Sequence, residues 1–289
     1  MESWNLGDLF ESVVDAIGDR EAVVAGDFSL SYDELDARVN RLAHVLAGRG
    51  VGPGDHVALV LRNGPEYLEA MLAAFKLRAV PINVNTRYTT EELTYLLRDA
   101  APAVVLHEPD LTAPVDTALA ELDLPAATLP RGGRYEEALA TAPPTRPAVA
   151  DRSGDDLYLF YAGGTTGFPK GVVWRHEDLL FAALGGGNPG GDPVGAPHEV
   201  AENARYGRSR CLPASPFTHG TAHWTALTTL LAGGTVVIDT GPTFDPARLW
   251  TVADEERVTI LVIVGDAFAR PHAIPGHRNR QRLERSCRP

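Results

Sequence analysis

The chain has 289 residues, of which 44% are hydrophobic and 22% are charged, and its formal net charge at pH 7 is −12. This composition is typical of a soluble globular protein, and the length suffices for one large domain or two ordinary ones. The negative charge argues against nucleic acid or an anionic membrane as the main partner. The two cysteines, Cys211 and Cys287, do not suggest a disulfide framework or a zinc site.

The N-terminal residues do not have the pattern of an export signal, because no basic segment is followed by an apolar one. No apolar run approaches the length of a membrane span. The run at residues 259–264, for example, has the length of a buried strand. We therefore expect a cytoplasmic protein without a transmembrane segment.

The first 110 residues alternate helix and strand signals, which predicts a parallel or mostly parallel sheet. Two helices are expected to begin with capping boxes at Ser31 and Thr89, each followed three residues later by a glutamate. Another helix is expected over residues 65–76, because Pro65 suits a first helical turn. The strands expected among these helices lie at residues 56–61, 79–84 and 103–106.

The second half begins with two segments rich in helix and strand breakers. Residues 141–154 contain three prolines and Gly154, which predicts a connector. Residues 185–197 contain six glycines and three prolines, and we expect an exposed, mobile loop there, with a lid over a binding site as the less favoured alternative. From Leu227 onward the sequence predicts a helix, a strand at 235–238, a helix at 246–256 and a strand at 259–264.

A glycine- and threonine-rich stretch at residues 161–171 lies between two predicted strands, at 157–161 and 171–174. Glycines allow backbone amides to converge on an anion, threonine hydroxyls add donors, and a lysine supplies a compact positive charge. The stretch therefore predicts polyphosphate binding. Its candidate binding residues are Gly163, Gly164, Thr165, Thr166, Gly167 and Lys170.

Two alternatives apply to this stretch. The P-loop pattern continues from its lysine into a helix, but here Gly171 replaces the expected Ser or Thr and a strand is predicted to follow. A glycine-rich hairpin with an incidental lysine is the other alternative, and it is disfavoured because the complete string of residues is so restrictive.

The stretch resembles the phosphate-binding signature of the adenylate-forming enzymes, which include acyl-CoA synthetases, luciferases and peptide-synthetase adenylation domains. One position departs from the family pattern, because Ala162 stands where the family usually has Thr or Ser. The resemblance implies that a carboxylate is joined to AMP from ATP and that the acyl group is then passed to a thiol. It also implies ATP, Mg²⁺ and CoA as cofactors and co-substrates, and Lys170 as a catalytic, phosphate-neutralising residue.

A second motif at residues 213–220 resembles the family segment that borders the carboxylate and acyl pocket. His219 is the matching position and a candidate catalytic residue, although an isolated histidine is more often structural. Trp224 is a weaker candidate for the acyl pocket, since such an aromatic is more often part of the core. Residues 216–220 include no acid to pair with a substrate ammonium, which favours the fatty-acid–CoA ligase branch over amino-acid activation.

The resemblance implies an α/β fold with the parallel-sheet subdomains of the family's N-terminal domain. We expect a first sheet subdomain at 1–150, the phosphate-binding loop and its strands at 151–180, and the start of a second α/β subdomain at 181–270. Residues 271–289 contain five arginines and one glutamate and are expected to be a disordered tail. Out-of-frame sequence on a truncated gene is favoured there over a basic interaction arm.

Three functions remain to be distinguished. The first is ATP-dependent activation of a fatty acid to acyl-AMP and then acyl-CoA. The second is a truncated, non-catalytic remnant or interaction module that retains a phosphate-binding loop, because the family's later motifs for adenine, ribose and a second catalytic lysine have no counterpart here. The absence of these later parts also predicts that the second sheet is incomplete. The third is an unrelated phosphate-binding protein with a P-loop-like site.

Overall fold

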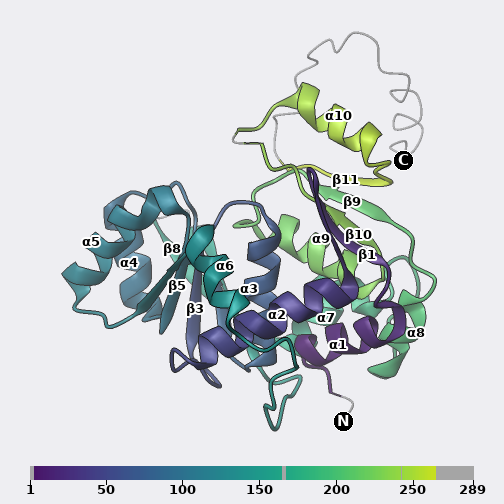
Figure 1. Ribbon diagram of the computed structural model, residues 1–289, viewed down its shortest axis with the longest axis horizontal. Coiled ribbons are helices and arrows are strands. Elements are labelled where there is room, and N and C mark those ends of the chain that lie inside the picture. The colour runs from purple at the N-terminus through teal and green to yellow at the C-terminus, as the bar shows by residue number, and fades with distance from the viewer. Residues whose placement is uncertain (1–2, 165–166, 242, 265–289) are drawn as a thin grey trace.

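A computed structural model describes residues 3–164, 167–241 and 243–264, which form a mixed α/β structure with two sheets (Figure 1). Its strands are β1 (Glu21–Ala25), β2 (Phe28–Ser31), β3 (His56–Val60), β4 (Val80–Asn83), β5 (Val104–His107), β6 (Ala127–Pro130), β7 (Leu157–Gly164), β8 (Gly167–Arg175), β9 (Arg210–Pro213), β10 (Thr235–Val237) and β11 (Ile260–Val262). Its α-helices are α1 (Leu6–Ile17), α2 (Tyr32–Ala47), α3 (Pro65–Lys76), α4 (Thr90–Ala100), α5 (Thr112–Leu122), α6 (Gly133–Ala140), α7 (His176–Ala183), α8 (His198–Ala204), α9 (Gly220–Leu231) and α10 (Pro246–Glu255). Two short 3₁₀ helices are η1 (Pro109–Leu111) and η2 (Gly185–Gly187).

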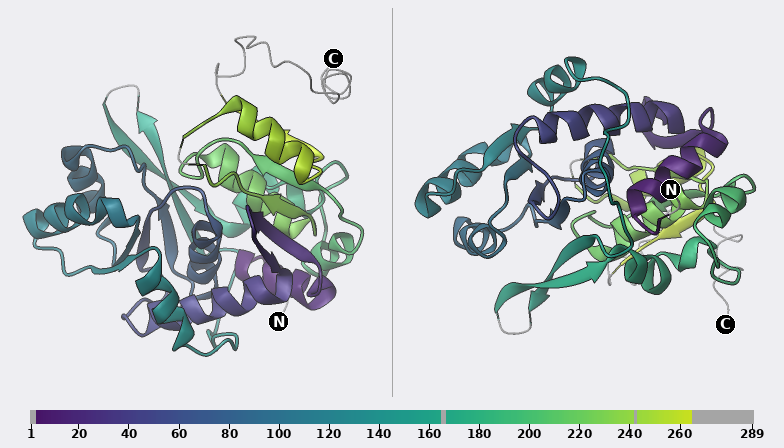
Figure 2. Two further views of the ribbon diagram at one scale, coloured as in Figure 1. Left: turned by 45° about the horizontal axis from the view of Figure 1, so that its top comes forward. Right: turned by 90° about the horizontal axis from the view of Figure 1, so that it is seen from below.

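The six-stranded sheet has the order β6-β5-β3-β4-β7-β8. All neighbouring pairs are parallel except β7 and β8, which form an antiparallel hairpin. Strands β4 and β5 are buried throughout, as expected of short apolar strands covered by helices on both faces. The predicted α/β class with parallel sheets is therefore confirmed, and the hairpin β7–β8 extends beyond the neighbouring strands (Figure 2).

The five-stranded sheet has the order β11-β9-β10-β1-β2 and is parallel except for the β1–β2 pair. Strand β1 joins β10 in parallel, with Val23 opposite Val236 and Val24 opposite Val237. Residues 1–150 thus contribute strands to both sheets. The domain boundaries expected at 150, 180 and 270, and the incompleteness of the second sheet, stay predictions.

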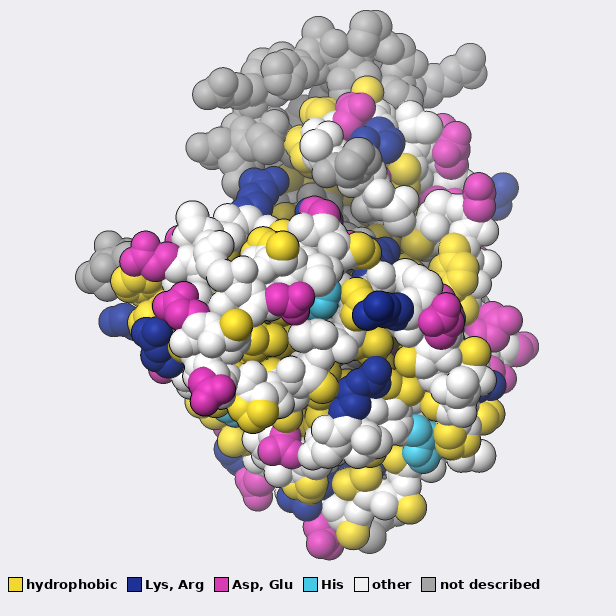
Figure 3. All heavy atoms as spheres, turned by 60° about the vertical axis from the view of Figure 1, so that its left-hand side comes forward, with side chains coloured by type: hydrophobic (Ala, Val, Ile, Leu, Met, Phe, Trp, Pro, Cys, Tyr) yellow, Lys and Arg dark blue, Asp and Glu magenta, His cyan; other side chains and the backbone are white. Residues whose placement is uncertain are grey.

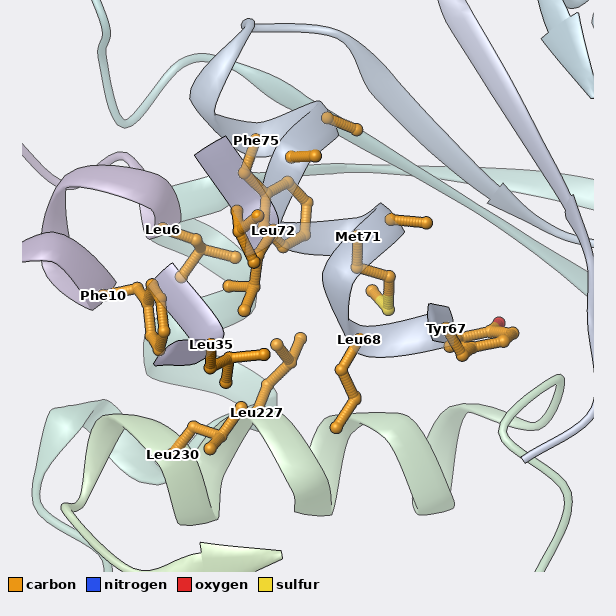
Figure 4. Packing of buried hydrophobic residues seen from close by; sticks show 14 of the residues in the cluster. Leu6, Phe10, Leu35, Tyr67, Leu68, Met71, Leu72, Phe75, Leu227 and Leu230 are labelled. Atoms are coloured by element: carbon orange, nitrogen blue, oxygen red, sulfur yellow. The ribbon is translucent and has the colours of Figure 1, made fainter. Parts of the chain in front are cut away.

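The hydrophobic core between the two sheets is centred on α3, whose residues are all buried except Glu66. Leu68 and Leu72 of this helix point toward Leu227 of α9, and α1 contributes Leu6 beside them (Figure 4). A helix that is apolar on nearly all sides is stable only when it is enclosed. Each fully buried leucine contributes about 1.5–3 kcal/mol relative to an exposed one. This packing joins the two sheets across α3.

The connector before β7 is fastened to α1 by arginines. The Arg146 guanidinium lies 2.7 Å from the Asp15 carboxylate, and the Arg152 guanidinium lies 2.8 Å from that of Asp8. Arg152 also donates a 2.9 Å hydrogen bond to the carbonyl of Lys76 at the end of α3. Residues 141–154, predicted to be a connector, accordingly contain no helix or strand and lead into β7 along a fixed path.

Local sequence signals locate the helix starts correctly. Ser31 and Thr89 form capping boxes at α2 and α4, and α3 has the predicted bounds. The expectation of an exposed loop at residues 185–197 is wrong in part. Gly186 and Gly187 are buried with positive φ, and a Cβ on Gly187 would lie 2.9 Å from a methyl group of Val200. Close packing of Gly187 against α8 and of Gly186 against Pro193 therefore accounts for these glycines.

Acidic and basic side chains are interspersed on the face shown in Figure 3 and do not gather there into a patch of one sign. In the described part of the chain, no helix combines the length and the apolar character that crossing a membrane requires.

Candidate functional site

The predicted phosphate-binding stretch forms the end of the β7–β8 hairpin. Ala162 on β7 lies opposite Lys170 on β8, and the register shifts between Ala162 and Gly164. The strand continues from Lys170 to Arg175, so the helix that follows a P-loop lysine is not formed here. Thr165 and Thr166 lie outside the described residues.

Lys170 is exposed, and its side chain makes no hydrogen bond or ion pair with another described residue. Its ammonium is therefore available to an external anion. A Cβ on Gly163 would meet no atom within 4 Å, so its backbone is open to a ligand. Gly171 has a different role, because a Cβ there would lie 2.9 Å from Cδ1 of Leu159. Neither glycine has a positive φ, so backbone conformation does not require glycine at either position. Gly163 leaves the backbone accessible, and Gly171 allows close packing against Leu159.

The hairpin is held against α4 by two contacts. The Phe168 and Tyr95 rings are stacked with their centroids 4.4 Å apart, and the Tyr161 hydroxyl donates a 2.6 Å hydrogen bond to the Asp99 carboxylate. Burial, together with the bonded carboxylate, raises the pKa of Tyr161, which keeps its hydroxyl protonated and donating. The base of the stretch is therefore fixed, although the Lys170 ammonium has no partner among the described residues.

The second predicted motif lies in the loop between β9 and α9. His219 is exposed at the N-terminal cap of α9, and its side chain makes no capping hydrogen bond. Its backbone amide donates a 2.9 Å hydrogen bond to the carbonyl of Pro216, which closes the turn before the helix. The imidazole is therefore held at the surface by its backbone, consistent with contact to a ligand.

A second histidine on α9, His223, was missed by sequence reasoning as a site residue. It is fully buried, with Nδ1 2.6 Å from the Phe217 carbonyl and Nε2 2.6 Å from the Tyr158 hydroxyl. Because a carbonyl only accepts, Nδ1 carries the proton and Nε2 accepts from Tyr158. Burial lowers the pKa of His223 to about 4, so the ring is neutral at pH 7. The available signal was its position one helical turn beyond His219.

Aromatic rings surround this histidine. Trp224 packs against Phe160 with ring centroids 5.3 Å apart and against Trp174 at 5.9 Å. Trp224 is half-buried and packs against the hydrophobic core, which agrees with the structural role weighed for it above. These rings adjoin the motif at Gly220, where a Cβ would lie 3.2 Å from the Phe160 ring.

Two asparagines that no sequence motif indicated hold these segments in place, Asn83 by bonding to both and Asn63 by bonding to the His219 loop. The Asn83 side chain, at the end of β4, bonds the backbone of Tyr161 and the carbonyl of Thr218. The Asn63 side chain, after β3, bonds the carbonyl of Ser215 and the amide of Phe217. The structure thus brings the stretch that contains Lys170 next to the loop that contains His219, at the carboxyl ends of parallel strands.

A cluster of metal-binding side chains is absent from the described residues. Over residues 3–164, 167–241 and 243–264, no group of three or more His, Cys, Asp or Glu side chains is arranged to hold a metal ion. None of the described residues is therefore assigned to Mg²⁺.

The chain is similar in sequence to several CoA ligases. It is 38% identical over 285 residues to a 3-oxocholest-4-en-26-oate–CoA ligase of Rhodococcus rhodochrous, covering 92% of this chain and 50% of that protein. It is 32% identical over 236 residues to the long-chain-fatty-acid–CoA ligase FadD13 of Mycobacterium tuberculosis, covering 81% and 44%. The chain thus spans about half the length of the curated relatives it matches.

The fold shows the same relationship. The inhibitor-bound N-terminal domain of FACL13 from Mycobacterium tuberculosis superposes with a TM-score of 0.77 at 30% identity, covering 90% of this chain and 62% of that one. The family model described as AMP-binding enzyme matches residues 10–284. The chain therefore belongs to the AMP-binding, adenylate-forming enzyme family and is homologous to acyl-CoA ligases.

Proposed function

We propose that this chain takes part in the ATP-dependent activation of an apolar carboxylic acid to acyl-AMP and then to acyl-CoA. One observation carries the proposal: the hairpin with the unbonded Lys170 adjoins the loop with the exposed His219, through the side chain of Asn83. The relatives named above act on a sterol carboxylate and on long-chain fatty acids. We assign the substrate to the same class, with ATP and CoA as co-substrates and Mg²⁺ accompanying ATP.

In the proposed reaction, a carboxylate oxygen attacks the α-phosphorus of ATP and forms the acyl–phosphate bond. The bond from the α-phosphorus to the bridging oxygen breaks, and pyrophosphate leaves with the electron pair. Lys170 neutralises the charge that grows on the phosphates, aided by the hydroxyls of Thr165 and Thr166 and by the backbone amides from Gly163 to Gly167. His219 borders the carboxylate. A thiolate of CoA then attacks the acyl carbon and AMP leaves.

The alternative is a non-catalytic protein that retains anion binding at the hairpin. It is favoured by one observation, that the chain spans about half the length of its curated relatives. The two functions differ in a measurable product, because both predict ATP binding whereas only the first predicts acyl-AMP.

The test is carboxylate-dependent exchange of labelled pyrophosphate into ATP, measured on the purified chain. The acids tested should run from short to long fatty acids and include 3-oxocholest-4-en-26-oate. Lys170→Ala is the site variant, and Arg175→Ala, at the other end of β8, is the matched control. We expect exchange that Lys170→Ala lowers by about 100-fold and Arg175→Ala leaves within about threefold.

Separate measurement of ATP binding by calorimetry distinguishes the outcomes. A folded chain that binds ATP but shows no exchange with any acid favours the non-catalytic alternative. Exchange that survives Lys170→Ala unchanged contradicts the role assigned to the hairpin.

A further inference from the structure

The Asn83 side chain lies where the strands β4 and β7 separate. These strands are paired in parallel at Ile82 and Leu159. Beyond that pair, the Asn83 amide nitrogen donates a 2.9 Å hydrogen bond to the Tyr161 carbonyl, and its oxygen accepts a 2.7 Å bond from the Tyr161 amide. The side chain therefore satisfies both backbone groups of Tyr161, as a neighbouring strand would, while the two backbones diverge.

The same amide group makes a third hydrogen bond to the other motif. Its nitrogen donates at 2.7 Å to the carbonyl of Thr218, the residue before His219. Asn83 is only 5% exposed and Thr218 is equally buried. A buried group of this kind has no water to replace a lost partner, so the geometry of all three bonds is tightly determined.

Only a primary amide meets these requirements at this position. The group must donate two hydrogen bonds and accept one within a single short side chain, which an aspartate or a leucine cannot do. A glutamine carries the same group one methylene further from the backbone. The identity of the residue and its length are therefore both constrained.

We infer that Asn83 is a positioning residue that sets the separation between the phosphate-binding hairpin and the His219 loop. The effect that we expect on the reaction rate rests on the proposed function, in which the hairpin holds ATP and the His219 loop borders the carboxylate. A displacement of about 1 Å between reacting groups lowers a rate by about 100-fold. The structural part, that one side chain couples two segments, is independent of any activity.

Asn63 provides an internal control. Its side chain donates a 2.9 Å hydrogen bond to the Ser215 carbonyl and accepts a 2.7 Å bond from the Phe217 amide. It therefore fastens the His219 loop to the first sheet, as Asn83 does, but its side chain makes no hydrogen bond to the described residues of the hairpin. Replacing Asn63 should loosen one segment, whereas replacing Asn83 should loosen two.

The experiment compares Asn83→Ala, Asn83→Gln and Asn63→Ala in the complete chain by residue-resolved amide hydrogen exchange. In Asn83→Ala we expect at least tenfold faster exchange at the Tyr161 amide and also at the His219 amide. In Asn63→Ala the Phe217 amide should exchange faster while Tyr161 is unchanged. An unchanged Tyr161 amide in Asn83→Ala, or equal acceleration of it in Asn63→Ala, overturns the inference.

Kinetics on the same variants separate positioning from mere stability. We expect Asn83→Ala to lower kcat for pyrophosphate exchange about 100-fold, with the KM values for ATP and for the acid each within about threefold. A purely structural role would reduce the folded fraction and leave kcat per folded molecule unchanged, which would contradict the inference. Asn63→Ala should instead raise the KM for the acid and leave that for ATP unchanged.

Two outcomes need a second measurement. If Asn83→Ala is recovered unfolded, Asn83→Gln decides, because it retains the amide while displacing it: kcat should fall although Tyr161 stays protected. A wild-type chain without exchange activity would overturn the proposed function, and amide hydrogen exchange would then decide on Asn83 by itself.

Discussion

Lys170 and His219 are exposed, whereas His223 and Asn83 are buried and contact the same two segments from inside. The exposed pair makes few or no bonds to the protein, so its members are free for a ligand. The buried pair has its polar atoms bonded within the fold. We call Lys170 and His219 the exposed layer, and His223 and Asn83 the buried layer. A substitution in the exposed layer should therefore change substrate binding or catalysis and leave the free energy of unfolding unchanged. A substitution in the buried layer should lower the free energy of unfolding or shift the two segments relative to each other.

The largest expected effect is a loss of stability on substitution in the buried layer. His223→Ala leaves the Tyr158 hydroxyl and the Phe217 carbonyl without their partner and creates a cavity among aromatic rings. The free energy of unfolding should fall by about 3–4 kcal/mol. Urea denaturation followed by fluorescence measures it. A loss below 1 kcal/mol would show that His223 is not held as described.

The second prediction concerns pH. Burial lowers the pKa of His223 and of His176 to about 4, from 6.5. Between these values the unfolded chain binds more protons than the folded one, so stability is full above pH 6.5 and falls as the pH decreases toward 4. Each histidine should lower the free energy of unfolding by about 2 kcal/mol between pH 7 and pH 5.

Urea denaturation at the two pH values checks this, with His223→Asn as the comparison. The variant should have a pH dependence smaller by about 2 kcal/mol, because it removes one of the two groups. An equal pH dependence in both proteins would contradict the assignment of a neutral, buried His223.

The third prediction concerns the exposed layer. His219→Ala should raise the KM for the acid about tenfold in the exchange assay, with the KM for ATP unchanged, because His219 borders the proposed carboxylate site. Its side chain does not cap α9, so the unfolding free energy should change by less than about 0.5 kcal/mol. A large loss of unfolding free energy would contradict this prediction, because it would show that the His219 side chain supports the fold as the buried residues do.

The smallest expected effect tests the anchoring of the hairpin. Tyr161→Phe removes the hydrogen bond to Asp99, but that carboxylate is exposed and water can replace the hydroxyl. We expect a loss of about 0.5–1 kcal/mol in unfolding free energy. The Phe168–Tyr95 stack should keep the hairpin in place, so ATP binding measured by calorimetry should change by less than about threefold.

Sequence reasoning succeeded where a signal is local. The capping boxes at Ser31 and Thr89, the proline at the start of α3 and the strands on both sides of the phosphate-binding stretch depend on neighbouring residues, and the structure has them in those places. The stretch forms a hairpin between the two strands that were predicted on either side of it. Its binding role, and that of His219, stay proposals.

The relationships that sequence could not supply join distant residues. Pairing of β1 with β10 places Val23 beside Val236, and no local pattern specifies a partner so far along the chain. Likewise, His219 at the N-terminal cap of α9 and His223 in its first turns are the same residue type, and only packing makes one exposed and the other buried.

The sequence by itself therefore determined the α/β class, the main helices and strands predicted above, and the two motifs that resemble the adenylate-forming family. The tertiary structure alone decided that these motifs adjoin, and that Asn83 and His223 connect them to the interior. The physical reason is that propensities and caps act over a few residues, whereas burial and hydrogen bonds between strands form only when the chain has packed.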